Sequence, residues 1–417
     1  MIKIPSAFFI FYFFIIIFFL FPSLYILLTG EISELYRYYN YQKYMNGLYS
    51  LINSIVLSFI VFFGSYFIMK QKVLLFTNVT IEDDKLSGCS FLKQYVKIRR
   101  ILLPITAIMI LFFFYKVGIT KLLLLGSDMD AWRFRMIGFD DTPRLIIAFN
   151  ELSRRVILPF LLVIELLNIS LFKEYSKKSF YVILFLFIIG IISTLDRAPL
   201  MMLIVVFIYI YFIVNPSLKK LFFGFIISLF LISIMASVMT YFQYNILNFN
   251  LLTIVNSAQH FIMHRVLMVP TYAALELSYI RFPIDDLFLN FQYTRLGALF
   301  GLEYIGTEGA RSVYVAPVGY LADSWRNYGY IAVAFTSFLL GLLASFIDRH
   351  NKKLNIYLLT AVSFLFIAFI LFLVFGVFYS QGSFIQMIFI CFIILVLNKK
   401  IIWKGNKDEN FNHNPIV

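Results

Sequence analysis

Long stretches without a single charged residue constrain this chain more than any other feature. Residues 6–28 contain no charge, and residues 48–69 contain none either. Roughly 20 apolar residues in a helix cross the hydrocarbon core of a bilayer, whereas a surface helix of a soluble protein needs only one apolar face. Apolar residues make up 61% of the chain and charged residues 14%, against about half and a quarter in soluble domains. The sequence therefore predicts an all-α, polytopic integral membrane protein.

We predict about ten transmembrane helices in a single membrane domain. The first follows Lys3 and is too long for the apolar region of a signal peptide, and no small-residue cleavage site accompanies it. Residues 242–327 are too long to be a structureless loop, so we expect a large helical outer loop with amphipathic or re-entrant helices. The ten predicted spans are 6–28, 48–69, 101–118, 156–172, 180–195, 198–214, 221–241, 328–347, 356–375 and 381–397.

The basic residues indicate the orientation of these spans. An even number of spans places both termini on one side, and short cytoplasmic segments carry an excess of lysine and arginine. With the N-terminus inside, the inner segments hold 20 of the 35 basic residues, and five of the other 15 lie in the long loop 242–327, which the rule does not count. We therefore expect a multi-pass membrane protein with both termini cytoplasmic.

Lysine and arginine are distributed differently between the two sides. The predicted inner segments hold 17 lysines and three arginines, whereas the outer ones hold 12 arginines and three lysines. Guanidinium binds phosphate or carboxylate through two parallel hydrogen bonds, so the outer face is expected to bind an anionic substrate such as a diphosphate or an acidic sugar. Alternatively, these arginines pair with outer acids or lipid headgroups. The outer arginines are Arg37, Arg133, Arg135, Arg144, Arg154, Arg155, Arg197, Arg265, Arg281, Arg295, Arg311 and Arg326.

Two stretches carry a resemblance to a known family. The first runs from Ser193 to Leu200 and contains Asp196-Arg197 between two apolar runs. The second runs from Arg295 to Tyr330; in it Arg295 and Gly306 are separated by ten residues, and Gly-Tyr-Leu-Ala-Asp-Ser-Trp-Arg-Asn-Tyr-Gly-Tyr leads into a span. Together with the predicted architecture, these stretches resemble the Wzy-type polymerases of O-antigen and capsule repeat units, whose outer loops carry functional arginines.

The resemblance implies a protein of the bacterial cytoplasmic (inner) membrane. It also implies that a glycan is transferred from polyprenyl diphosphate to a sugar hydroxyl of the next lipid-linked repeat unit, at the outer face. Preorganised arginines would stabilise the charge that develops on the departing diphosphate, and a base would help to remove the acceptor proton. No cofactor or metal is expected. The expected partners are the polyprenyl-diphosphate-linked oligosaccharide, membrane lipids and other polysaccharide assembly proteins, and not nucleic acid. We assign catalysis to Arg197, Arg295, Arg311 and His260, and substrate binding to Arg265, Arg281, Arg326, Asp323 and Trp325.

Other polar residues admit more than one interpretation. His260 and His264 would share one face of a helix, where an ordinary hydrogen-bonding role competes with a base or a metal pair. Asp128-Met129-Asp130 matches the metal-binding Asp-x-Asp of nucleotide-sugar transferases, but no nucleotide sugar is expected outside. Glu165 lies within a predicted span, and we expect structural pairing with Arg154 or Arg155. The competing functions are an O-antigen ligase and a lipid-linked oligosaccharide flippase or transporter.

Overall fold

The computed structural model of this chain describes most of the predicted membrane domain. The described residues are 2–30, 41–69, 75–79, 85–124, 142–172, 176–194, 197–214, 319–351, 354–375 and 381–397, with five isolated helical positions between 223 and 234.

Helices form almost all of the described chain. Five helical stretches are long and apolar enough to cross a membrane, and they span Ala7–Thr29, Gly47–Ile68, Tyr95–Leu123, Gly329–His350 and Ile356–Val374. The protein is therefore an all-α protein of membrane-embedded type, while the count of ten spans stays a prediction. The helices, with π-helical turns written η, are α1 (Ala7–Ile15), η1 (Ile16–Leu20), α2 (Phe21–Thr29), α3 (Tyr41–Met69), α4 (Lys85–Phe113), η4 (Phe114–Gly118), α5 (Ile119–Leu123), α7 (Arg144–Leu152), η5 (Ser153–Ile157), α8 (Leu158–Leu171), α9 (Lys178–Thr194), α10 (Arg197–Val214), α15 (Gly319–His350), α16 (Ile356–Phe375), α17 (Gln381–Phe392) and η10 (Ile393–Leu397).

A small antiparallel sheet departs from the helical expectation. Strand β1 (Ile2–Pro5) pairs with β2 (Phe76–Val79), with Ile2 opposite Val79. Backbone groups that lie outside a helix need other hydrogen-bond partners, and here the segment before α1 finds them in the segment after α3. The amide of Ser6 extends this pairing to the Leu75 carbonyl (3.0 Å). The sheet therefore ties the start of the first helix to the chain beyond the end of α3.

Two helices begin well before the predicted spans. Helix α4 starts at Lys85, 16 residues ahead of the predicted boundary at residue 101, and so includes Arg99 and Arg100. Helices α7 and α8 are joined by η5 into one helical run from Arg144 to Leu171. Both extensions contain charged residues. A span predicted from apolar residues stops at such residues, although the backbone continues through them as a helix.

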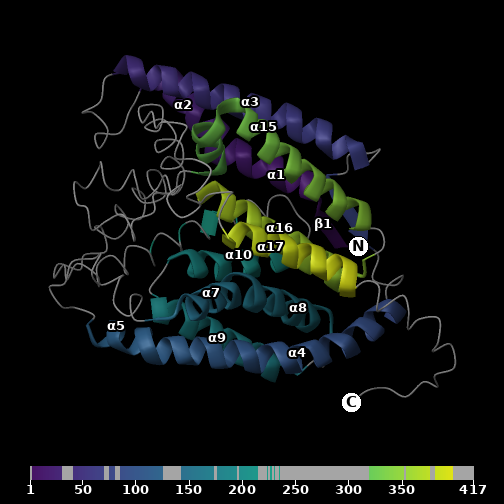
Figure 1. The fold of residues 1–417 in the computed structure, drawn as a ribbon. Helices are drawn as coiled ribbons and strands as arrows, with labels where there is room; N and C mark the ends of the chain where they lie inside the picture. Colours follow the sequence, from purple (N-terminus) through teal and green to yellow (C-terminus); the bar gives the residue numbers. More distant parts are fainter. Residues whose placement is uncertain are drawn as a thin grey trace.

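The helices run between two ends of the bundle, which we name after one residue at each. At the Asp348 end, the Asp348 carboxylate near the C-terminus of α15 accepts hydrogen bonds from the Ala7 amide of α1 (2.9 Å) and the Tyr66 hydroxyl of α3 (2.7 Å). At the opposite, Gly329 end, α15 turns back on itself and α7 begins (left side of Figure 1).

Ring contacts fix the directions of further helices. Phe91 near the start of α4 stacks on Tyr357 at the start of α16, with centroids 5.5 Å apart. The ring centroids of Phe212, near the end of α10, and Phe76 of β2 lie 6.3 Å apart. The starts of α1, α4 and α16 and the ends of α3, α10 and α15 therefore share the Asp348 end, as the predicted alternation of spans requires. Which end faces the cytoplasm stays a prediction.

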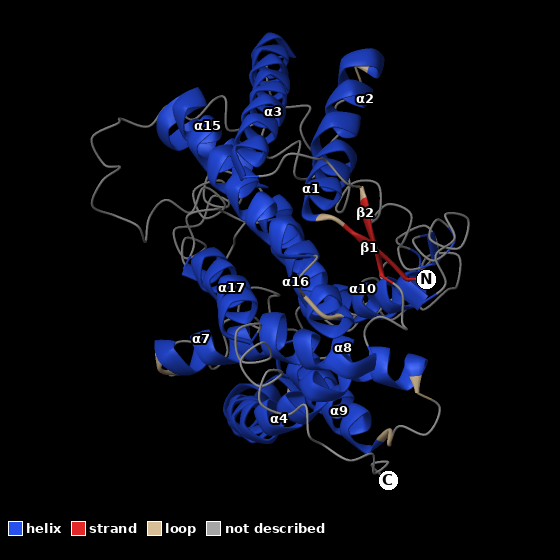
Figure 2. Cartoon of the chain, turned by 90° about the vertical axis from the view of Figure 1, so that its right-hand side faces the viewer, coloured by secondary structure: helices blue, strands red, loops and turns tan. Residues whose placement is uncertain are grey.

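Helix α16 occupies the centre of the bundle. In the most apolar stretch of α16, 94% of the residues are buried. Figure 2 shows α16 between two groups of helices, one formed by α1, α2, α3 and α15 and the other by α4, α7, α8 and α9. It contacts β1 through a bond from the Ser363 hydroxyl to the Pro5 carbonyl (3.0 Å). It contacts α10 through a bond from the Tyr209 hydroxyl to the Thr360 carbonyl (2.9 Å). The two groups are thus held together through α16.

Small residues allow α15 to pack closely on α3. Ser337, Gly341 and Ser345 recur every four residues, so they lie on one face of α15. The Ser345 hydroxyl donates to the Tyr66 carbonyl (2.7 Å), and a Cβ added to Gly341 would lie 2.6 Å from the Phe62 carbonyl oxygen. Membrane helices associate through such close backbone approach because lipid provides no hydrophobic drive between them.

Candidate functional site

Helix α15 is a hairpin rather than one straight rod. Gly329 has φ +62°, a left-handed conformation that glycine adopts without the steric penalty of a Cβ atom. The Ser324 and Thr336 hydroxyl oxygens lie 3.2 Å apart, although 12 residues of straight helix would separate their Cα atoms by about 18 Å. Residues 319–328 therefore fold back along the helix that begins after Gly329, which is visible as the hook of α15 in Figure 1.

A cluster of hydroxyl groups holds the returning helix against α3. The Tyr320 hydroxyl lies 2.9 Å from the Ser58 hydroxyl of α3, and the Ser337 hydroxyl donates to the same Ser58 oxygen (2.8 Å). All three side chains are buried. Ser58 stands near the middle of the apolar stretch Gly47–Ile68, so the helix before Gly329 reaches the middle of that stretch. We call residues 319–328 the re-entrant helix, a form that the sequence predicts for the outer loop.

The re-entrant helix carries three of the predicted substrate-binding residues. Asp323, Trp325 and Arg326 lie on it, between the Tyr320 contact and the turn at Gly329, and the structure describes their backbone alone. The sequence predicts that this stretch leads into the span 328–347; its residues 319–328 form the first arm of the α15 hairpin. Arg326 is three residues from Gly329 and therefore belongs to the Gly329 end of the bundle.

Arg197 belongs to the same end. Helix α9 is described to Thr194 and α10 from Arg197. Residues 195–196, where the sequence predicts a break, lie outside the described part of the chain. A Cβ added to Gly118 of η4 would lie 2.8 Å from the Ser193 Cα, which places the end of α9 beside the end of α4 and η4. Three peptide units allow at most about 11 Å between the Cα atoms of Thr194 and Arg197.

Two further arginines approach one carboxylate at the Gly329 end. Arg154 and Arg155 lie on η5, and both form ion pairs with Glu151 one turn earlier, the Arg155 Nε at 2.6 Å from Oε2. Arg154 is fully buried, and a Cβ added to Gly190 of α9 would lie 3.1 Å from its Cγ and Cδ atoms. The Arg155 guanidinium lies 5.1 Å from the ring centroid of Phe372 near the end of α16. For these two arginines, pairing with a nearby acid is the observed arrangement.

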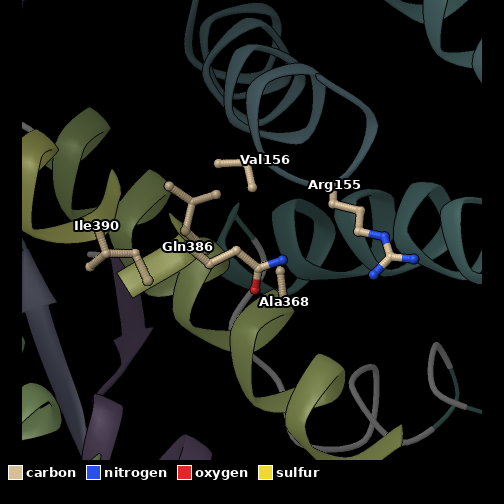
Figure 3. Close-up of a pocket in the computed structure, with 6 residues that line it drawn as sticks. Arg155, Val156, Ala368, Gln386 and Ile390 are labelled. Carbon is tan, nitrogen blue, oxygen red and sulfur yellow. The ribbon is translucent and has the colours of Figure 1, made fainter. Parts of the chain in front are cut away.

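A narrow crevice adjoins this arginine pair. It is lined by Arg155, Val156, Leu365, Ala368, Gln386 and Ile390 and is too tight to hold a water molecule. Figure 3 shows the Gln386 amide beside Ala368, whereas the Arg155 guanidinium extends away from it. The Gln386 Oε1 atom is buried and has no hydrogen-bond partner among the described residues. In this conformation the crevice is a packing feature and does not accommodate a sugar or a phosphate.

The prediction that Glu165 pairs with Arg154 or Arg155 is wrong. Glu165 is fully buried and forms an ion pair with Arg99 of α4 (2.5 Å), and the same Oε1 atom accepts a bond from the Tyr95 hydroxyl (2.8 Å). Ten or more residues along one helix separate Glu165 from the η5 arginines by about 15 Å, beyond the reach of the side chains. Arg99 reaches Glu165 because α4 packs beside α8, toward the Asp348 end.

The described basic residues differ between the two ends. This agrees with the separation of arginine from lysine seen in the sequence. The Asp348 end holds Lys3, Lys85, Lys93, Lys97, Lys177 and Lys178 with Arg99, Arg100 and Arg349. The Gly329 end holds Arg144, Arg154, Arg155, Arg197 and Arg326 with Lys43, Lys116 and Lys121.

The remaining predicted site residues lie outside the described part of the chain. This holds for the predicted catalytic residues Arg295, Arg311 and His260 and for the predicted substrate-binding residues Arg265 and Arg281. The Asp128-Met129-Asp130 motif lies outside it as well. The structure therefore brings Arg197 and Arg326 to one end of the bundle and leaves the placement of the others as a prediction.

Sequence reasoning missed the hydroxyl cluster of Tyr320, Ser58 and Ser337. Serines in apolar helices are common, because a serine hydroxyl can also bond within its own helix. The available signal was the four-residue repeat of small residues beginning at Ser337, which marks a helix contact face. Comparison with known protein families, curated proteins and solved structures finds no match to this chain.

Proposed function

We propose that this protein is a membrane glycosyltransferase that polymerises lipid-linked oligosaccharide repeat units of an O-antigen, capsule or exopolysaccharide. The observation that carries the proposal is the separation of basic residues, arginine at the Gly329 end and lysine at the Asp348 end. Positive charge alone does not require this choice of residue, whereas recognition of a phosphate by a planar fork of N–H donors does. The Gly329 end is proposed to be the outer face.

The proposed reaction exchanges one bond for another. The bond between the donor sugar's anomeric carbon and the polyprenyl diphosphate oxygen breaks, and the acceptor sugar hydroxyl forms the new glycosidic bond. The diphosphate leaves with the bonding electron pair, and arginines held close to the lipid surface stabilise its charge. The acceptor proton passes to a base, for which His260 is the candidate. Arg197, Arg295 and Arg311 are the candidates for the diphosphate contact.

Two other functions are alternatives to polymerisation. An O-antigen ligase would use the same donor with a different acceptor. A flippase or transporter is expected to bind its cargo near the midplane of the membrane, between two repeated halves, whereas the described arginines of this chain concentrate at one end. All three functions act on a polyprenyl-linked glycan but at different steps. Loss of each function therefore leads to accumulation of a different intermediate.

Deletion of the gene, followed by analysis of lipid-linked glycans, tests the proposal. Loss of a polymerase leaves single repeat units on the lipid at the outer face. Loss of a ligase leaves unattached polymer, and loss of a flippase traps single units inside; either result would reject the proposal.

Complementation with Arg197→Lys should restore little polymer at a normal protein level, because lysine keeps the charge but loses the fork. Arg349→Lys, at the Asp348 end, is the matched control and should restore polymer fully.

A further inference from the structure

The re-entrant helix has two attachment points among the described residues. One is the covalent turn at Gly329, and the other is the contact of Tyr320 with Ser58, nine residues earlier in the chain. Between them, the Ser324 hydroxyl lies 3.2 Å from that of Thr336. Only the Tyr320 contact joins the start of this helix to another element by a hydrogen bond in the described structure. That hydroxyl therefore holds the start of the re-entrant helix, beside the buried side chain of Leu321.

We infer that Tyr320 is a positioning residue for the proposed glycan transfer. Its hydroxyl holds the re-entrant helix, and with it Asp323, Trp325 and Arg326, in place at the Gly329 end. The effect on glycan transfer rests on the proposed function, whereas the hydroxyl contacts among Tyr320, Ser58 and Ser337 do not depend on that function.

The chemistry of the contact favours positioning over packing. Tyr320 is 1% exposed, and a phenylalanine ring would occupy nearly the same volume without a polar atom to bury. A buried hydroxyl is costly unless it is hydrogen-bonded, so its presence here is explained by the bond to Ser58. Ser58 is itself held by Ser337, which links the start of the re-entrant helix to the membrane-crossing part of the same hairpin.

Positioning matters because an arginine that stabilises developing charge acts through its location. A displacement of about 1 Å in a catalytic group can lower a rate on the order of 100-fold. Arg326 lies six residues after Tyr320, and both belong to one continuous helix up to Gly329. Loss of the bond at the start of this helix removes a polar contact with α3, so the segment that carries Arg326 is expected to shift about Gly329.

Disulfide cross-linking measures the position of the helix without any substrate. Ser324→Cys and Thr336→Cys are introduced together in a protein whose own cysteines, Cys89 and Cys391, are replaced by serine. The 3.2 Å separation of the hydroxyl oxygens suits a disulfide, so a membrane-permeable oxidant should cross-link the pair rapidly. Adding Tyr320→Phe should slow cross-linking several-fold. Tyr209→Phe, which removes another buried hydroxyl bond, is the matched control and should leave the rate unchanged.

A rescue experiment separates positioning from other roles. Tyr320→Phe alone should give shortened polymer at a normal protein level, and closing the 324–336 disulfide in the same variant should restore polymer length. Failure of the oxidised tether to restore polymer would overturn the positioning role, as would normal polymer in Tyr320→Phe. Failure of the pair to cross-link in the otherwise unchanged protein would overturn the hairpin itself. If the cysteine pair does not accumulate, the polymer lengths of Tyr320→Phe and Tyr209→Phe at equal protein level decide the role, and equal normal lengths would overturn it.

The outcomes for this inference and for the proposed function are distinct. Cross-linking rates depend only on the fold, so they remain informative if gene deletion shows that the protein is not a polymerase. Conversely, a polymerase whose Tyr320→Phe variant cross-links and polymerises normally would retain the proposed function and lose the positioning role of Tyr320.

Discussion

At the scale of single residues, the Asp348 carboxylate joins three helices. Its Oδ1 atom accepts from the Ala7 amide (2.9 Å) and the Asn351 side chain (2.9 Å), and its Oδ2 atom accepts from the Phe8 amide (3.3 Å) and the Tyr66 hydroxyl (2.7 Å). The first amides of a helix have no partner within the helix and carry the positive end of its dipole. A buried carboxylate is therefore well placed at the start of α1.

Asp348→Asn should destabilise the protein by about 2 kcal/mol. The amide keeps one oxygen but turns an –NH₂ group toward donors that need an acceptor. Melting of the purified protein in detergent measures the loss. Arg349→Gln is the control, because Arg349 follows Asp348 in the chain, is exposed and also loses its charge in this variant. Equal melting temperatures for the two variants would contradict the capping role.

Glu165 shows why a buried ion pair is hard to assign from sequence. Two arginines on its own helix, Arg154 and Arg155, were the nearest candidates along the chain, and the helix itself keeps them out of reach. Arg99, the observed partner, stands 66 residues away and was assigned to an inner loop. Its pairing became possible because α4 begins early enough to carry Arg99 alongside α8.

At the scale of elements, the hairpin in α15 was only half predictable. The predicted start of the span, residue 328, lies one residue before Gly329, where the apolar stretch that ends at His350 begins. The sequence also led us to expect amphipathic or re-entrant helices in the outer loop. It did not indicate that residues 319–328 turn back, because a glycine within a helical pattern is compatible with a continuous helix and becomes a turn only when another element, here α3, holds the two arms together.

Gly341→Ala should disrupt the contact between α15 and α3. The new Cβ would lie 2.6 Å from the Phe62 carbonyl oxygen, and backbone cannot yield as a side chain can, so a cost of about 1–3 kcal/mol is expected. Thermal melting and the yield of monodisperse protein measure the effect. Gly64→Ala on α3 is the matched control, because none of the described atoms lies within 4 Å of its added Cβ. Alanine favours a helix over glycine by about 1 kcal/mol, so Gly64→Ala should leave stability unchanged or raise it. An equal rise in stability for Gly341→Ala would contradict the close contact.

At the scale of the whole molecule, the sequence predicted class and direction better than contacts. Long uncharged runs located the membrane-type helices, and alternation of spans gave their relative directions, because both follow from the thickness of the bilayer. The site is different. Arg197 and Arg326 come to one end of the bundle as expected, but the hydroxyl cluster around Ser58 and the pairing of Glu165 depend on which helices are neighbours, and residue spacing along one helix does not encode that.

The two ends of the bundle are predicted to face opposite sides of the membrane, with the lysine-rich Asp348 end in the cytoplasm. Thr29, at the end of α2, and Lys177, just before α9, are both exposed and lie at opposite ends. In a protein with Cys89 and Cys391 replaced by serine, Thr29→Cys should react with an impermeant thiol reagent in intact cells. Lys177→Cys should react only after the membrane is permeabilised. The reverse pattern would place the arginines of the Gly329 end inside the cell, where no polyprenyl-linked glycan is polymerised in the proposed reaction, and would reject orientation and function together.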